Sequence, residues 1–360
     1  MSVALKKMYW WVRTHVSAIA FASGFIWDTL TLKRIDLLYE NIVFISYLIV
    51  AFIGIVLLHG VETRRFTSRV LLNTRAWLPI LVQFPMGGLM SGFMIFYSKS
   101  ASILTSWPFL AILLTLLVGN EFFRKRYEKL VFQVGMFYFA LISYITLTMP
   151  ILHGAMGASI FLFGGILSLL VMAGLLARLY ALLPKLFQRG GKKAWGMVAF
   201  VYVVFNTLYF SNIIPPVPLV LTEIGIYHSV VRSGLGEYVV TYEEPKWYEV
   251  WRSTHATYHK TSGEAGYCFS SVFAPTSLRV PIYHSWQRKS EQGRWTRDTR
   301  VRFTIEGGRL GGYRGYTIKQ NLQEGEWRCV VETETRQVIG EVRFKVVVSD
   351  TPTLLKEGVR

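Results

Sequence analysis

The first two-thirds of the chain alternate long apolar stretches with short clusters of basic residues. A helix needs about 20 mainly apolar residues to cross the roughly 30 Å hydrocarbon layer of a membrane. Seven stretches approach this length: residues 11–32, 38–58, 77–97, 103–119, 130–150, 159–179 and 195–214. We expect seven transmembrane helices within a domain spanning residues 1–225. The first stretch follows basic residues as a signal peptide would, but its apolar run is long, so we expect an uncleaved helix.

The pattern changes after residue 214. Three prolines, Pro215, Pro216 and Pro218, end the helical pattern and form a linker. Short runs rich in Val, Tyr, Phe, Trp and Thr follow, at residues 237–242, 247–252, 267–273, 280–287, 301–305, 316–319, 327–332 and 342–348. Strands at this spacing predict an all-β, immunoglobulin-like antiparallel sandwich over residues 226–360.

Composition supports a membrane protein and argues against nucleic-acid binding. The chain is 52% hydrophobic and only 17% charged, which is unusual for a soluble protein. Its net charge of +17 would suit nucleic acid only if the basic residues formed one solvent-facing stripe. They lie instead in clusters between apolar stretches, so we expect the lipid bilayer, and no nucleic acid, as a partner.

The basic clusters also predict an orientation. The N-terminal tail and the second, fourth and sixth connections carry 16 Lys and Arg residues, and the intervening connections carry three, Lys33, Arg34 and Lys99. Because Lys and Arg are retained in the cytoplasm, the N-terminus should lie inside. An odd number of helices then places the C-terminal domain outside the cytoplasm.

Small residues four positions apart predict where helices pack closely, because they let two backbones approach. The candidate contacts are Gly88-x-x-x-Gly92, Ala20-x-x-x-Gly24 and Gly164-x-x-x-Ser168.

Several segments carry a family resemblance. They include Gly24-Phe25-Ile26-Trp27-Asp28, Gln83-Phe84, Leu208 to Pro216, Gly225-Ile226-Tyr227-His228-Ser229, Tyr283-His284-Ser285-Trp286 and Gly325-Glu326-Trp327-Arg328. With these segments the chain resembles bacterial multipass inner-membrane proteins whose C-terminal part is the domain of unknown function 2914. The resemblance implies an inner-membrane protein with a periplasmic β domain. It implies no catalytic residue, because the family has no assigned activity.

The two cysteines, Cys268 and Cys329, lie in predicted strands 61 residues apart, with Trp286 between them. Immunoglobulin-like domains with a cross-sheet disulfide have this arrangement. Outside the cytoplasm such a bond can persist, which makes a Cys268–Cys329 disulfide one of two interpretations. The alternative is two buried thiols that act as small apolar residues.

Within the apolar stretches, Asp28, Gln83 and Asn206 are the candidate polar site. The acidic residues lie near helix ends beside basic residues, so interfacial ion pairing is the competing explanation. A proton-coupled transporter is disfavoured, because only neutral polar groups lie near the middle of the stretches.

In the β domain, His255-x-x-x-His259 has the spacing of helical zinc ligands. Along a strand, however, four residues span about 13 Å, too far for one ion. The glycine-rich segment 307–315 could bind an anion with Arg309 and Arg314, but it lacks a phosphate-loop signature and is typical of a turn. We expect no metal, cofactor or catalytic residue.

Trp247 and Trp251 should share one face of a strand, because side chains alternate along strands. With Arg309 and Arg314 they are the candidate binding surface, although core packing or contact with the membrane interface are alternatives. We expect a membrane-anchored, non-enzymatic module that binds an envelope protein or glycan. The alternative is a membrane-embedded enzyme or transporter whose helices act on a lipid or small solute.

Overall fold

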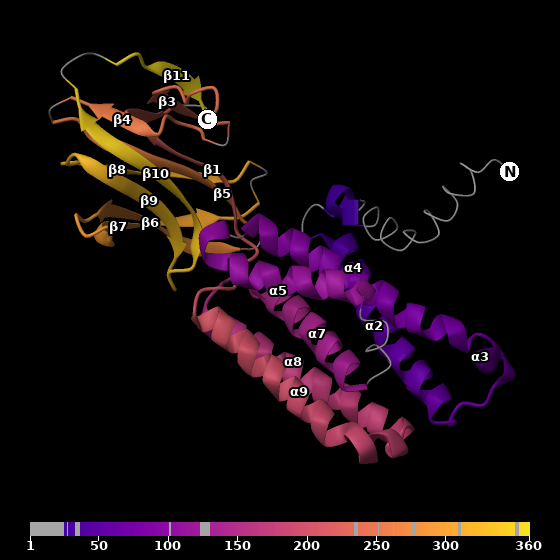
Figure 1. The fold of residues 1–360 in the computed structure, drawn as a ribbon. Coiled ribbons are helices and arrows are strands. Elements are labelled where there is room, and N and C mark those ends of the chain that lie inside the picture. Colours follow the sequence, from indigo (N-terminus) through magenta and orange to yellow (C-terminus); the bar gives the residue numbers. More distant parts are fainter. Residues whose placement is uncertain are drawn as a thin grey trace, which may run out of the picture. The chain divides into compact units, whose positions relative to one another are not determined.

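An N-terminal helical region with several apolar helices is followed by a C-terminal β-sheet domain (Figure 1). The structure, a computed structural model, describes residues 25–360 except residues 27, 33–36, 101, 123–129, 234–236, 251, 262, 276–277, 309–310 and 350–352. The chain divides into two compact units. The helical unit comprises Met1–Lys99, Pro108–Met149 and Ser159–Ser211, and the β unit comprises Ser100–Trp107, Pro150–Ala158 and Asn212–Arg360.

The helices follow the apolar stretches closely. They are α2 (Leu38–Glu62), α3 (Arg69–Asn73), η1 (Arg75–Trp77), α4 (Leu78–Ser100), α5 (Ile103–Phe122), α7 (Leu130–His153), α8 (Ala158–Leu182) and α9 (Pro184–Phe210). Among the described residues, five helices are long and apolar enough to cross a membrane, and Thr105–Gly119 is a shorter apolar segment. The first predicted helix, residues 11–32, lies mostly outside the described residues.

The last helix begins earlier than the apolar pattern predicts. It starts at Pro184 instead of near residue 195 and ends at Phe210. Proline suits the first turn of a helix, where its missing N–H would have no partner within the helix. The polar segment that follows therefore lengthens the helix instead of forming a loop.

Glycines allow the close helix contacts that the sequence predicts. A Cβ on Gly88 would lie 2.5 Å from the Tyr47 ring of α2, and one on Gly92 would meet Phe44. Gly164 faces Met149 of α7 at 3.2 Å from such a Cβ. The predicted contacts at Gly88, Gly92 and Gly164 are thus present, whereas Ala20-x-x-x-Gly24 lies outside the described residues.

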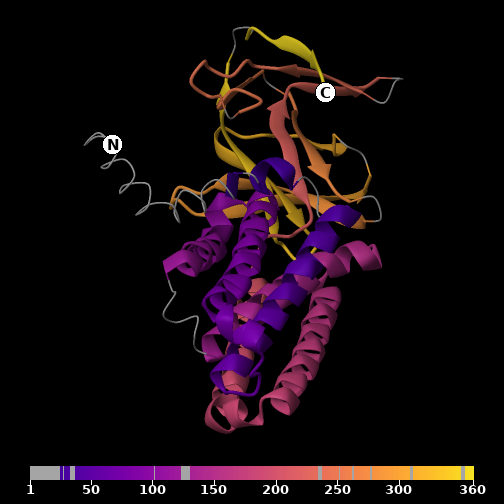
Figure 2. The same ribbon diagram turned by 90° about the vertical axis from the view of Figure 1, so that its right-hand side faces the viewer.

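The described residues of the β unit form three sheets. Its strands are β1 (Val220–Tyr227), β2 (Ser229–Arg232), β3 (Tyr238–Tyr242), β4 (Thr257–Lys260), β5 (Gly266–Phe273), β6 (Arg279–Lys289), β7 (Trp295–Glu306), β8 (Tyr313–Lys319), β9 (Gly325–Thr333), β10 (Val338–Val348) and β11 (Lys356–Val359). The strand orders are β1-β5-β8, β4-β10-β9-β6-β7 and β11-β3-β2. Figure 2 shows β11, with the C-terminus, at one end of this unit.

Two of these sheets share a core. One buried cluster combines Ile226 and Cys268 of the β1-β5-β8 sheet with Trp286, Trp327 and other residues of the five-stranded sheet. A second cluster around Val272 and Val331 also receives Met156, from the connection between α7 and α8. The backbone N–H of Arg279 donates to the carbonyl of Gly154 in the same connection at 3.2 Å. The β unit therefore uses chain that precedes α8.

The strand predictions are wrong in three respects. Residues 247–250 form turns instead of a strand, because backbone hydrogen bonds from Glu249 to Lys246 and from Arg252 to Glu249 close short turns after Pro245. Strands β1, β2, β4 and β11 were not expected. Pairing is also not wholly antiparallel, since β4 runs parallel to β10.

Candidate functional site

A histidine–glutamate cluster, formed by His228, Glu243, His259 and Glu264, joins segments that are distant in sequence. His228 lies between β1 and β2, Glu243 follows β3, His259 lies in β4, and Glu264 precedes β5. The Nδ1 of His228 lies 2.5 Å from Glu264, and its Nε2 lies 3.1 Å from Glu243. Glu243 also accepts a hydrogen bond from the backbone N–H of His259 at 2.6 Å, and its second oxygen lies 2.7 Å from the ring.

The centre of this cluster is buried. The side chains of His228 and Glu243 are 5% and 8% exposed. The His228 ring stacks on Tyr258 at 4.3 Å between centroids, and the Tyr258 hydroxyl donates to the carbonyl of Ala265. Each ring nitrogen of His228 thus has a partner, which fixes the ring orientation.

The carboxylates favour the protonated form of His228. Burial lowers the pKa of His228, but the hydrogen bonds and charges of Glu243 and Glu264 outweigh burial and raise the pKa above its ordinary value. Burial raises the pKa of Glu243, but hydrogen bonds from His228 and His259 outweigh it, so the pKa is lowered. The cluster is a histidine–glutamate hydrogen-bond network with a buried centre, and it joins segments of all three sheets.

This network fixes both ends of the loop between β3 and β4. The backbone N–H of His255 donates to the carbonyl of Glu243 at 3.0 Å. Inside the loop, the buried Glu249 accepts from the backbone N–H of Lys246 at 3.0 Å, and Arg252 donates to the carbonyl of Arg343 of β10. The loop is therefore tied down at several points.

Large apolar side chains protrude from this loop. Trp247 is 89% exposed and Val250 80%, and the Trp247 and Tyr248 rings meet edge to face at 5.7 Å. Leu354, 85% exposed, precedes β11, whose Lys356 pairs with Tyr242 at the start of the same loop. We call Trp247, Tyr248, Val250, Leu354 and Leu355 the apolar tip. Monomeric proteins rarely expose such a group of apolar residues without a binding role.

The predicted binding surface is only partly brought together. Trp247 is in the apolar tip, whereas Arg314 lies half-buried in β8. Trp251 and Arg309 lie outside the described residues. The glycine-rich segment connects β7 to β8, and the N–H groups of Gly307 and Gly308 donate to the carbonyls of Leu278 and Ala274. Those two groups are occupied, which argues against an anion-binding nest there.

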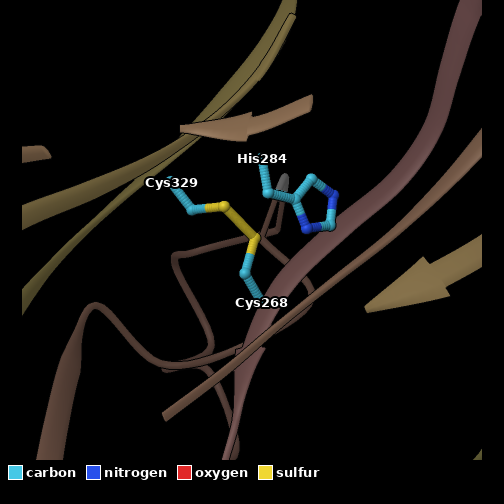
Figure 3. A group of neighbouring side chains, drawn as sticks. All are labelled: Cys268, His284 and Cys329. Atoms are coloured by element: carbon cyan, nitrogen blue, oxygen red, sulfur yellow. A yellow bond between two sulfur atoms is a disulfide. The ribbon is translucent and has the colours of Figure 1, made fainter. Parts of the chain in front are cut away.

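The separation expected between His255 and His259 is wrong. Their ring centroids lie 6.2 Å apart, because His255 sits in the bend before β4 and not within the strand. Among the described residues, the one group with the spacing of metal ligands is Cys268, His284 and Cys329. The two sulfur atoms are bonded to each other (Figure 3), so they are not available to a metal.

The Cys268–Cys329 disulfide joins β5 to β9 and thus links the two sheets that share a core. Beside it, the Nε2 of His284 lies 2.7 Å from the Ser270 hydroxyl and its Nδ1 lies 3.0 Å from that of Thr317. Trp286 donates to the same Thr317 hydroxyl at 3.0 Å. Burial lowers the pKa of His284 to about 3. The Ser270–His284 pair has the spacing of a catalytic dyad. Both residues are fully buried, so a substrate could not reach them.

The predicted polar site of the helices is not assembled as one group. The amide of Asn206 donates to the carbonyl of Tyr202 in its own helix at 2.8 Å. Gln83 lies half-buried in α4, and Asp28 lies beside Ser91.

A different polar group was missed. The ring of His59 in α2, which is 1% exposed, lies 2.8 Å from Gln133 of α7 and 2.7 Å from Glu62. Glu62, near the end of α2, thus contacts a histidine of its own helix. Histidine at a helix end gives no periodic signal, so only the packing of α2 against α7 reveals this contact.

Comparison with known proteins identifies the C-terminal part. Residues 280–346, from β6 to β10, match the family described as "Protein of unknown function (DUF2914)". The chain carries a DUF2914 domain. The match confirms the resemblance for this part of the chain, and it brings no assigned activity. No curated protein matches the chain.

Among solved structures, the chain is similar to the Pseudomonas fluorescens alkylpurine DNA glycosylase AlkC bound to DNA containing an abasic site analog. The identity is 10%, over 87% of this chain and 99% of that chain, with a TM-score of 0.20, too low to indicate a shared fold.

The DUF2914 match includes Cys329, His284 and Trp286 but excludes the histidine–glutamate cluster and the apolar tip. These two features therefore lie in parts of the β unit outside the matched DUF2914 segment.

Proposed function

We propose that this protein is a membrane-anchored, non-enzymatic module whose β unit lies outside the cytoplasm and binds an envelope component through the apolar tip. One observation carries the proposal. Trp247 is exposed on the loop between β3 and β4, and the histidine–glutamate cluster holds that loop in place. A fixed loop loses little conformational entropy on binding, which favours affinity.

The composition of the apolar tip favours a protein partner over a glycan. Sugar hydroxyls need hydrogen-bond partners, and burying them against aliphatic groups is costly. Val250, Leu354 and Leu355 add exposed aliphatic side chains to the aromatic pair. Aromatic residues in an apolar surround are typical of protein-binding hot spots.

We also propose seven crossings of a bacterial inner membrane, the first by residues 11–32, with a cytoplasmic N-terminus and a periplasmic β unit. Two connections that carry few basic residues, 100–107 and 150–158, belong to the β unit. The connection containing Arg64 and Arg65 belongs to the helical unit. Lys and Arg are retained on the cytoplasmic side of a membrane. The grouping of the β unit with the weakly basic connections therefore supports its proposed location outside the cytoplasm.

For the β unit itself we propose an immunoglobulin-like sandwich. A disulfide crosses between the two sheets that share a core, and Trp286 of β6 lies opposite Cys329 in the ladder between β6 and β9. This combination is the hallmark of that fold.

Photo-crosslinking in the full chain tests the binding proposal. A benzoylphenylalanine at position 248 should give a discrete protein adduct in intact cells. The adduct should be lost on Leu354→Asp, because Leu354 belongs to the same surface. The matched control is a probe at Val231 of β2, which is 60% exposed but lies outside the apolar tip. Equal adducts at both positions, or an adduct indifferent to Leu354→Asp, would contradict the proposal.

Orientation is tested separately by an alkaline phosphatase fusion after Arg360. The enzyme should be active, since it folds only outside the cytoplasm. An inactive fusion on an intact chain would place the β unit inside.

One observation favours the alternative, a membrane-embedded enzyme or transporter. A cavity of about 240 Å³ lies among α5, α7 and α9, lined by apolar residues such as Phe132, Met136, Met197 and Phe205. Such a cavity suits an acyl chain or an apolar solute. Accumulation of one lipid or solute species in cells carrying Phe205→Trp, which fills the cavity, would support this second function.

A further inference from the structure

A second and larger cavity lies where α8 ends and α9 begins. It has a volume of about 750 Å³ and is lined by Tyr180 of α8 together with Phe187, Lys192, Lys193 and Trp195 of α9. Gly191 shapes its wall, because a Cβ there would lie 2.7 Å from the Phe187 ring.

The described lining of this cavity contains two lysines and no carboxylate. Lys192 and Lys193 are exposed, and across the described residues neither forms an ion pair. No Asp or Glu occurs between residues 129 and 222, so the hairpin formed by the end of α8 and the start of α9 carries no acidic residue of its own. A cavity with two free ammonium groups favours an anionic ligand.

The other residues of the lining favour a phospholipid over free phosphate. Leu176, Phe187 and the rings of Tyr180 and Trp195 give the cavity a mainly apolar floor. Free phosphate would leave this floor exposed to water. A phospholipid would cover it with glycerol and acyl groups while its phosphate meets the lysines. Trp and Tyr also favour the depth of lipid headgroups.

Membrane orientation alone does not account for these features. Basic residues that orient a helix need only charge, and they need neither a cavity nor aromatic side chains beside them. Lys185 is such a residue, because it lies in the same hairpin but outside the lining of the cavity.

We propose that this cavity binds an anionic phospholipid of the surrounding bilayer, with its phosphate at Lys192 and Lys193 and its acyl region against Tyr180 and Trp195. The proposal rests on the membrane location proposed above. It adds a lipid ligand to a part of the helical unit remote in sequence from the apolar tip.

Native mass spectrometry of the full chain, extracted from membranes in detergent, tests the proposal. Phosphatidylglycerol and phosphatidylcholine with identical acyl chains are titrated separately. The wild type should retain phosphatidylglycerol preferentially. Lys192→Gln/Lys193→Gln should weaken that retention by roughly 10- to 30-fold, at about 1 kcal/mol per lysine. The matched control, Arg178→Gln/Lys185→Gln, removes the same charge outside the cavity and should retain the lipid as the wild type does.

Equal retention of the two lipids by the wild type would overturn the lipid site, as would equal losses in both double variants. Failure of the membrane proposal is distinguishable, because the chain would then remain soluble after cell lysis without detergent, and both proposals would fall. A chain found in membranes but without lipid preference would overturn only the lipid site.

Discussion

Glu243 contacts His259 in two ways: one carboxylate oxygen accepts the backbone N–H at 2.6 Å, and the other lies 2.7 Å from Nδ1. The first contact fixes the backbone of β4 at its third residue, and the second fixes the side chain. Because Glu243 directly follows β3, the pair closes the loop that carries the apolar tip. The presentation of Trp247 thus depends on a buried carboxylate that does not itself reach the surface.

Stability of the β unit should depend on pH through this cluster. The raised pKa of His228 gives stabilisation that is complete below its ordinary value of 6.5 and is lost as pH rises through the folded value. The lowered pKa values of Glu243 and Glu264 give stabilisation that is present above 4.5 and is lost as pH falls through theirs. The cluster should therefore contribute most between these two values.

His228→Gln tests this window. The variant should cost about 1–3 kcal/mol at pH 6, because it leaves buried partners unsatisfied. It should also abolish the loss of stability at alkaline pH that this histidine causes. Hydrogen exchange of β3 and β4 peptides in the full chain, corrected for the intrinsic pH dependence of exchange, measures both effects. If the variant loses stability at alkaline pH as the wild type does, His228 is not the cause of that loss.

His284 should stay neutral far below the usual range. Burial lowers its pKa to about 3, so its ring should remain uncharged at pH 5. The unfolded chain takes up a proton there, so this residue should reduce stability as pH falls from 6.5 towards 3. Nitrogen chemical shifts of the labelled ring give its charge directly, and a protonated ring at pH 5 would show that the site admits water.

The disulfide should contribute substantially to the β unit. Cys268→Ala/Cys329→Ala should lower the free energy of unfolding by about 2–5 kcal/mol. Denaturation followed by tryptophan fluorescence measures this loss, and reductant should destabilise the wild type but leave the variant unchanged. If the wild type is equally indifferent to reductant, the bond contributes nothing to stability.

Glycines at helix contacts should tolerate substitution unequally. Gly92→Ala should destabilise the helical unit by about 1–3 kcal/mol, because its Cβ would overlap the Phe44 ring. Gly174→Ala is the matched control, since a Cβ there meets nothing within 4 Å. By helix propensity this control should be neutral or stabilising by up to about 1 kcal/mol. Thermal melting in detergent compares the two, and equal melting temperatures would argue against close packing of α2 and α4.

Apolar periodicity was sufficient to predict much of the architecture. The helices α2, α4, α5, α7 and α8 follow predicted apolar stretches, and β5, β6 and β9 combine β-branched and aromatic residues with clear turn boundaries. The start of α9 was missed because Gly190, Gly191 and the neighbouring lysines look like a loop. Short edge strands such as β4 were missed because four residues carry little periodicity.

The candidate site was mostly beyond sequence reasoning. Trp247 was selected as a candidate exposed aromatic residue and is exposed, but it was predicted in a strand and lies in a turn. His228 and Glu264 lie 36 residues apart and meet because β1 and β5 pair as neighbouring strands. No spacing rule covers such a contact, since it depends on the pairing of strands.

The position of Met156 in the sequence limits how the β unit could be transferred between proteins. Met156 packs in the core of the β unit, but it precedes two helices, α8 and α9, in the sequence. Moving residues 212–360 onto another anchor would therefore leave a hole in the transplanted core. Gene fusion and domain shuffling should seldom separate the strands from the helices, and substitutions in the α7–α8 turn should be accepted together with compensating changes around Val331 and Leu219.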